Sequence, residues 1–308
     1  MSAPAFRFSY NVFAYQWSFP EVVAHGLSLF RDADLDIDFG SFRAGQGANK
    51  NAVYEDLIRS GRSDLYHAGE WACISRVVEA PESCLVARSV PGEGTLNSSF
   101  STFVSPGSSI EEPGDLAKRK VAIELGTGSY YTAILDMSPH VPMEDMRLVQ
   151  IGSPHRRLLS LMEGEVDAAS LIHPWTELAT AMGMTRVMET GRKNPTLAVT
   201  RRSMPPAALE RFFRAVNSAI EVINGGAGLA RSLYVAHFEE ILATMPEPVR
   251  LAAKGIRDWM AIPKWNRWEA YGREEFDGTC RWMKDRGLLP KEAAYEDAAY
   301  PDMEGIFA

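Results

Sequence analysis

Cysteine, long apolar runs and clustered basic residues are all scarce in this sequence. Only three cysteines occur, Cys73, Cys84 and Cys280, without C-x-x-C spacing, so the sequence predicts reduced, buried thiols, no disulfide framework and no metal site. No run of about 18 uncharged apolar residues is present, so no membrane insertion is expected. The net charge of −8 argues against a nucleic-acid partner, because neutralising phosphates requires clustered Lys and Arg.

The N-terminal ten residues, MSAPAFRFSY, also lack the features of an export signal. Such a signal needs a basic stretch followed by about 7 to 15 apolar residues. The sequence therefore predicts a cytoplasmic location, or a periplasmic one if a leader had been removed.

What the sequence does contain is the composition of a globular protein and an alternation of strand and helix patterns. Its 308 residues are 46% hydrophobic and 23% charged, enough for one large or two modest domains. A capping box at Ser18 and Glu21 is expected to begin the first helix. The first α/β unit is predicted to contain strands at 6–10, 35–39 and 65–66 and helices at 19–30 and 51–59.

A second α/β unit is expected to begin near residue 116. Strands are predicted at 121–125, 166–172, 186–188 and 196–200, and helices from 129 onward and at 153–162. The remainder reads as helical, at 207–223, 228–238, 246–259 and 273–286. In the first of these helices, apolar residues at three- and four-residue intervals predict a core-facing stripe: Leu209, Phe212, Phe213, Val216, Ile220 and Ile223.

Three phrases in this order carry a family resemblance. They are IEEPGDLAKRKVAIELGTGSYY at 110–131, LLSLMEGEVDAASLIHPW at 158–175, and RGLL at 286–289. The sequence resembles the type 2 periplasmic binding proteins, in particular the receptors for sulfonates, nitrate and thiamine precursors, together with their cytoplasmic enzyme relatives such as desulfinases and decarboxylases. The resemblance implies two α/β lobes, each a mixed sheet flanked by helices, with a ligand cleft between them. It places residues 1–102 and 198–308 in the first lobe and 103–197 in the second, with crossing strands near 101–104 and 198–200.

The clearest local signal is Gly126-Thr127-Gly128-Ser129, between a strand and a helix. Glycines allow close backbone approach, and the first N–H groups of a helix lack internal partners and favour negative charge. We therefore expect Thr127, Gly128 and Ser129 to hold a carboxylate, sulfonate or phosphate. A simple turn capped by Ser129 is the alternative.

A second signal is the pair His67 and Glu70, three residues apart after a short strand. Such a pair can share a proton, as general acid–base catalysis requires. His173, after another strand, is placed to face His67 across the cleft. We predict catalytic roles for these three residues. The alternatives are a structural histidine beside a solvated Glu70 for the pair, and a purely structural histidine for His173.

Aromatic and basic residues accompany the candidate cleft segments. The predicted ligand contacts are Tyr15, Gln16, Trp17, Arg43, Gly45, Trp71, Tyr130 and Trp175. Arg156 and Arg157 are further candidates for an anion, with a solvated helix face as the alternative. Trp265 and Trp268 are interpreted as a packing clamp, or else as the contact of a homodimer.

Three function classes follow. The preferred one is a cytoplasmic, cofactor-free lyase or hydrolase acting on a small aromatic or carboxylated anion. The desulfinases' nucleophilic cysteine is absent from residues 10–17, and so is the cysteine-rich iron motif of the pyrimidine synthases, which puts those two activities in doubt. The alternatives are a substrate-binding protein of an ABC transporter, without catalysis, and a ligand-sensing module.

Overall fold

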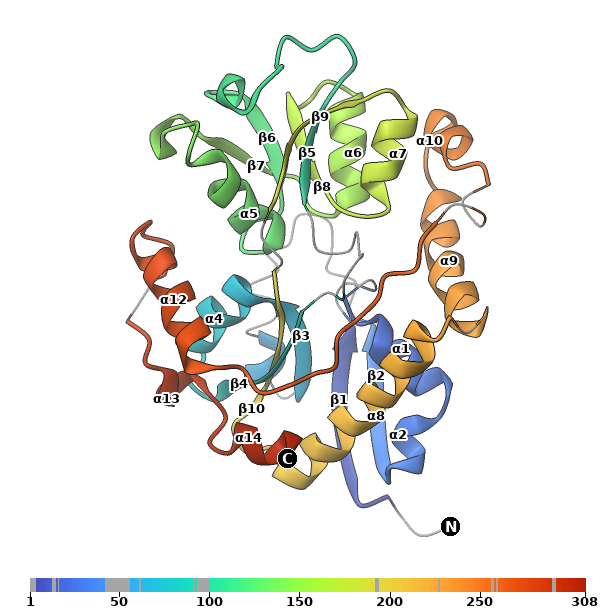
Figure 1. The fold of residues 1–308 in the computed structure, drawn as a ribbon, viewed down its shortest axis with the longest axis vertical. Coiled ribbons are helices and arrows are strands. Elements are labelled where there is room, and N and C mark those ends of the chain that lie inside the picture. Colours follow the sequence, from blue (N-terminus) through green and yellow to red (C-terminus); the bar gives the residue numbers. More distant parts are fainter. Residues whose placement is uncertain are drawn as a thin grey trace.

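Two five-stranded mixed sheets, one in each of two lobes, form the framework of the molecule (Figure 1). This description comes from a computed structural model. It covers residues 4–12, 15, 17–41, 56–60, 62–90, 92, 100–191, 194–226, 228–255, 258, 260–289 and 292–308.

The first sheet has the strand order β2-β1-β3-β10-β4. β1 runs parallel to β2 and to β3, and β10 is antiparallel to both of its neighbours. Its strands are β1 (Phe6–Val12), β2 (Leu35–Ser41), β3 (Leu65–Gly69), β4 (Ser83–Ser89) and β10 (Thr196–Arg201).

The second sheet has the order β7-β6-β8-β5-β9, with β6 parallel to β7 and β8 and with β5 antiparallel to β8 and β9. Its strands are β5 (Ser101–Val104), β6 (Lys120–Ile123), β7 (Arg147–Gln150), β8 (Ala168–Leu171) and β9 (Thr185–Glu189). The predicted two-lobed α/β fold class is therefore confirmed.

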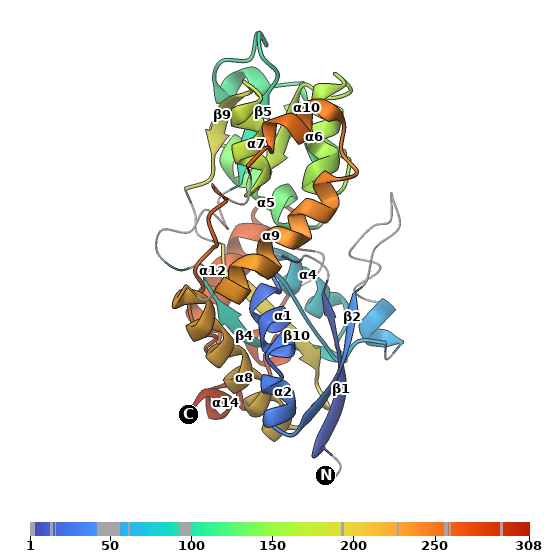
Figure 2. The same cartoon turned by 90° about the vertical axis from the view of Figure 1, so that its right-hand side faces the viewer.

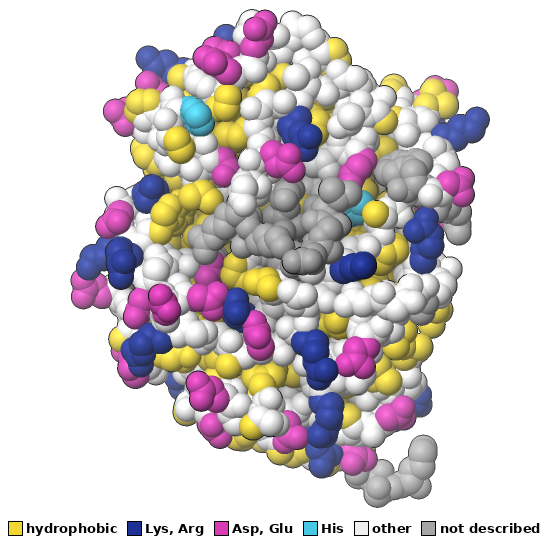
Figure 3. Space-filling view, viewed as in Figure 1, with side chains coloured by type: hydrophobic (Ala, Val, Ile, Leu, Met, Phe, Trp, Pro, Cys, Tyr) yellow, Lys and Arg dark blue, Asp and Glu magenta, His cyan; other side chains and the backbone are white. Residues whose placement is uncertain are grey.

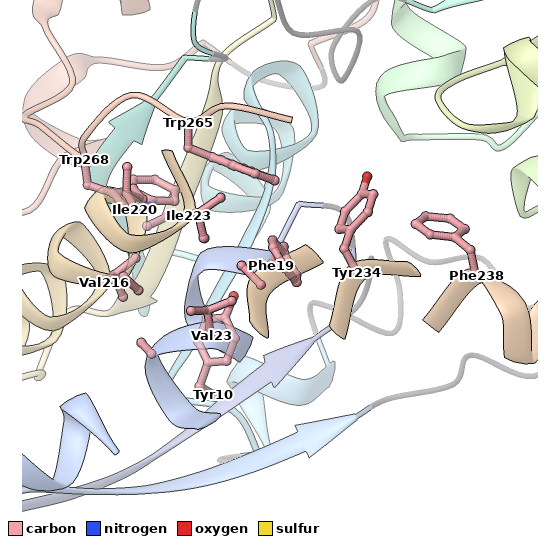
Figure 4. Close-up of a cluster of buried hydrophobic side chains, with 14 of the residues drawn as sticks. Tyr10, Phe19, Val23, Val216, Ile220, Ile223, Tyr234, Phe238, Trp265 and Trp268 are labelled. Atoms are coloured by element: carbon pink, nitrogen blue, oxygen red, sulfur yellow. The ribbon is translucent and has the colours of Figure 1, made fainter. Parts of the chain in front are cut away.

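Helices cover both sheets. The described ones are α1 (Phe19–Gly26), α2 (Leu29–Asp32), α4 (Glu70–Glu79), α5 (Gly128–Met137), α6 (Pro154–Met162), α7 (Trp175–Ala181), α8 (Pro206–Asn224), α9 (Gly228–Leu242), α10 (Glu247–Ala252), α12 (Arg273–Lys284), α13 (Tyr295–Ala298) and α14 (Met303–Phe307). The predicted stripe of α8 is confirmed, because all six of its residues are buried in the core shown in part in Figure 4. Among the described residues, no helix has the length and apolar character that a membrane span needs.

Several local predictions differ from the structure. The helix predicted at 19–30 is broken at Ser28, whose backbone is left-handed with φ of 63°. The predicted capping box is wrong, since the Ser18 side chain makes no cap and the Glu21 carboxylate turns towards His67.

The sequence patterns do not predict α4, β4 and β7, which the structure contains. The helix predicted at 51–59 lies partly outside the described residues, and α10 ends at Ala252 instead of 259.

The chain after residue 198 does not stay with the first sheet alone. α8 packs against α1 and α2 of the first lobe, whereas α10 contacts α7 of the second lobe. α9 connects them and runs alongside both lobes (Figures 1 and 2). The region assigned to the first lobe by the sequence therefore includes a helix that lies against the second.

Candidate ligand-binding site between the lobes

The loop from Glu124 to Ser129, at the carboxyl end of β6, has a tightly bonded shape. The Glu124 N–H donates to Ser129 Oγ at 3.0 Å, and Thr127 Oγ1 donates to the Glu124 carbonyl at 2.8 Å. Gly126 has φ of +66°, a conformation that favours glycine. α5 then begins at Gly128, with Thr127 at the N-cap position. The first amides of α5 are thus presented by a rigid loop, as an anion site requires.

Arg157, on α6, supplies a positive charge at the same edge of the second sheet. Its side chain is 2% exposed, and its Nε and Nη1 have no hydrogen-bond partner among the described residues. Burial lowers the pKa of its guanidinium to about 10, while the attraction of Glu124 acts in the opposite direction. Arg157 therefore stays charged at neutral pH. A buried charge with unused donors is the arrangement expected where an anion binds.

His173 lies just after β8, the strand next to β6, at the same edge of the second sheet. Its peptide bond to Pro174 is cis. Its Nδ1 lies 2.6 Å from Glu177 Oε1, and His173 holds the pKa of that carboxyl below its usual value against the effect of burial. Its Nε2 is buried and lacks a hydrogen-bond partner within the described part of the chain. The ionised Glu177 orients the ring, which leaves Nε2 available to a ligand.

α9 forms a side wall where the lobes meet. The His173 ring stacks on Tyr234 with centroids 6.2 Å apart, and Trp175 meets Phe238 at 6.4 Å. On the first-lobe side, Tyr15 stacks on His237 at 3.8 Å and donates from its hydroxyl to the α9 backbone. Figure 4 shows Tyr234 and Phe238 side by side along α9, near Phe19.

Comparison with protein-family models and with curated proteins finds no significant match to this sequence. Comparison with solved structures does find similar folds. The alkanesulfonate-binding protein SsuA from Xanthomonas axonopodis pv. citri, bound to MOPS, superposes with a TM-score of 0.72 at 16% identity, covering 97% of this chain and 99% of that one. The Escherichia coli periplasmic aliphatic sulphonate-binding protein SsuA gives 0.67 at 18% identity, with all of both chains covered. The desulfurization enzyme DszB gives 0.60 at 15% identity, covering 96% and 97%.

This chain has the type 2 periplasmic-binding-protein fold. The fold is shared by binding proteins and by at least one enzyme among these structures. Because the sequence identities are below 20%, these superpositions establish the architecture alone. The activity must be argued from the residues of the site.

His67 lies inside the first lobe, with partners other than the predicted one. Its Nδ1 is 3.1 Å from Tyr10 Oη and 3.5 Å from Glu21 Oε1, and its ring packs on Trp268 at 4.3 Å. Tyr10 Oη also donates to Ser18 Oγ at 2.9 Å. His67 is 3% exposed as a whole residue, so the structure places it in a buried polar network at the start of α1.

Glu70 begins α4 and has a different set of partners. Its Oε1 accepts hydrogen bonds from Tyr271 Oη at 2.7 Å and Thr279 Oγ1 at 2.9 Å. The neighbouring Trp71 is buried between Tyr131 and Trp282. The structure thus gives His67 and Glu70 separate partners instead of the expected shared proton, and it places Trp71 in the core instead of a ligand wall. The reason is that β3 ends at Gly69, where the chain turns into α4 and aims the two side chains into different clusters.

The remaining predicted contacts divide into three groups. Trp17 lines a narrow recess of the first lobe together with Trp265 and Trp268, and Tyr130 is a half-buried residue in the first turn of α5. Trp175 is 2% exposed and contributes to the α9 wall. Gln16, Arg43 and Gly45 lie outside the described residues.

Metal ligation finds no support in the described ranges, where no group of three or more His, Cys, Asp or Glu side chains gathers. Basic and acidic side chains are interspersed on the face shown in Figure 3. This face therefore has no single sign of charge, and the positive charge of Arg157 lies buried beneath the surface.

Proposed function

We propose that this protein binds a small organic anion with an aromatic or apolar body in the cleft between its lobes. The carrying observation is the buried Arg157, whose Nε and Nη1 have no hydrogen-bond partner in the part of the chain that the structure describes. The N–H groups of such a guanidinium can each donate a charge-assisted hydrogen bond to an oxygen of a carboxylate or sulfonate. The amides at the start of α5 supply further donors from the adjacent strand end, β6.

Aromatic residues support an apolar body for the ligand. The recess of Trp17, Trp265 and Trp268 includes Thr196, and Thr196 pairs with Gly69 in the first sheet. A Cβ atom added at Gly69 would lie 3.9 Å from the Cα of Gly128. Thr196 thus connects the tryptophan recess with the strand pair that meets the start of α5, and this proximity supports a ligand with an apolar part and an acid group.

Calorimetric titration with benzenesulfonate, benzoate, ethanesulfonate and sulfate tests the proposal. We expect at least one organic acid to bind, and Arg157→Met to weaken its affinity about 10- to 100-fold, the range of a charged hydrogen bond. Arg156→Met is the matched control, because Arg156 is the exposed neighbour on the same helix. Equal affinities of the Arg157→Met variant and the wild type would remove the basis of the proposal.

A second candidate function is a cofactor-free lyase or hydrolase reaction on such an acid, and His173 favours it. Glu177 holds Nδ1 at 2.6 Å while Nε2 has no partner in the described ranges, the arrangement of an oriented proton-transfer group. Incubation with carboxylates and sulfinates followed by chromatography tests this function. We expect His173→Gln to bind the acid within about threefold of wild type and to lose turnover by about 100-fold. Turnover that survives this substitution would rule out His173 as the proton carrier.

A further inference from the structure

The two lobes touch directly where α4 of the first lobe meets the loop that precedes α5 of the second. Arg76, on α4, is 2% exposed, and its Nη2 donates to the carbonyl oxygen of Gly126 at 3.3 Å. Its guanidinium also lies 5.9 Å from the centroid of the Tyr66 ring. A buried guanidinium is expensive to desolvate, so its contacts constrain where the lobes sit.

The Gly126 carbonyl is part of the anion-site loop itself. Other polar groups of this loop are bonded within the second lobe, from Thr127 Oγ1 to the Glu124 carbonyl, from the Glu124 N–H to Ser129 Oγ, and from the Leu125 N–H to Gln150 Oε1 of β7. Arg76 therefore adds a donor from the opposite lobe to a loop whose remaining shape is locally fixed. Its positive charge therefore lies next to the Gly126 carbonyl of this loop.

Two further contacts flank Arg76 along the same seam. Gly69 and Gly128 approach so closely that a Cβ at Gly69 would be 3.9 Å from the Gly128 Cα. Trp71 and Tyr131 stack at 5.8 Å with their planes 28° apart. α4 and α5 lie next to each other in both views of the molecule (Figures 1 and 2). The seam is therefore packed on either side of the buried charge.

We propose that Arg76 is a positioning residue that couples closure of the lobes to the shape and charge of the anion site at Gly126–Ser129. This inference rests on the proposed anion-binding function. When the lobes separate, Arg76 leaves Gly126, and the loop loses both a fixed carbonyl and a nearby positive charge. By linkage, an anion that binds the loop favours the closed arrangement to the same extent that closure favours the anion.

The test combines small-angle X-ray scattering with calorimetry, using benzenesulfonate and benzoate as probes. The variants are Arg76→Met and Arg76→Lys, and Arg147→Met serves as the control, because Arg147 is an exposed arginine of the second lobe. We expect the wild type to be compact with or without probe. We expect Arg76→Met to have a larger radius of gyration that decreases when probe is added, and to bind about tenfold or more weakly. Arg76→Lys should recover part of both properties, and Arg147→Met should match the wild type.

A wild-type radius of gyration and affinity in both Arg76 variants would overturn the inference. If Arg76→Met does not fold, the same two measurements on Arg76→Lys decide it, since lysine keeps the charge but lacks the guanidinium geometry. The proposed function fails separately, if the wild type binds neither probe or if Arg157→Met binds as well as the wild type. Even then, the scattering of the probe-free Arg76 variants shows whether this residue holds the lobes together.

Discussion

Replacing Arg157 by methionine should stabilise the ligand-free protein while weakening its affinity for anions. Desolvation lowers the pKa of this guanidinium from 12.5 to about 10, even with the attraction of Glu124 opposing the shift. Because one pKa unit corresponds to about 1.36 kcal/mol, the charged form destabilises the folded state by about 3 kcal/mol. The group is a base with a depressed pKa, so this penalty is fully present below pH 10 and is relieved as the pH rises towards 12.5. At pH 7 the whole penalty applies.

Methionine suits the test because it fills most of the space of the arginine stem and carries no charge. Taking about 2.1 cal/mol/K of unfolding entropy per residue, a gain of about 3 kcal/mol in this chain of 308 residues corresponds to a rise of about 5 °C in Tm. Thermal and urea unfolding at pH 7 measure this change. The Arg156→Met control should stay within about 0.5 kcal/mol of wild type, since that side chain is exposed.

Adding a binding anion should narrow this difference in stability. At about 100 times the wild-type Kd, a ligand stabilises the wild type by about 2.7 kcal/mol, whereas the Arg157→Met variant, whose affinity is about 10- to 100-fold weaker, gains about 0.4 to 1.4 kcal/mol. If Arg157→Met instead lowers the ligand-free stability by about 3 to 5 kcal/mol, the arginine is a paired structural charge and the reasoning is refuted.

Further predictions concern packing, pH and thiol reactivity. Gly128→Ala should lower stability by about 1 to 3 kcal/mol in urea unfolding, because its Cβ would lie 3.0 Å from Phe100 Cε2, inside normal contact. Burial raises the pKa of the Asp136 carboxyl to about 6, so its folded state favours the protonated form. Stability should therefore fall as the pH rises from about 4 to about 6, by about 1 kcal/mol after screening, and Asp136→Asn should flatten this part of a pH–stability profile. All three cysteines are buried and burial raises each thiol pKa to about 12, so the native protein should react with Ellman's reagent only after denaturation.

The fold was largely predictable because its signals are local. Alternation of apolar residues indicated β1 and β2, and three- and four-residue spacing indicated α8, since a single buried face imposes each period. β4 and α4 were missed. Seven of the ten α4 residues are buried, so the helix has no continuous polar face from which a helical period could be recognised. β4 is buried in all but one position and therefore lacks the alternation of polar and apolar residues that indicates a strand.

The anion site was predictable in part. Glycines between a strand and a helix identified the Gly126–Ser129 loop. This pattern can be recognised from neighbouring residues alone, because glycines allow close approach of the backbone and the first N–H groups of a helix lack internal partners. Arg156 and Arg157 could not be distinguished, since both follow the same strand and begin the same helix. Only the packing of α6 onto the second sheet turns Arg157 inward and leaves Arg156 in solvent.

By itself the sequence determined the alternation of strands and helices, the core stripe of α8 and the glycine loop at the start of α5, all of which depend on neighbours within a few residues. The tertiary structure decided the partners of the polar side chains. It separated His67 from Glu70, paired His173 with Glu177 beside α9, and set Arg76 of one lobe against Gly126 of the other. These contacts join residues up to about 200 positions apart, so their geometry is fixed only when the two sheets and the helices between them are in place.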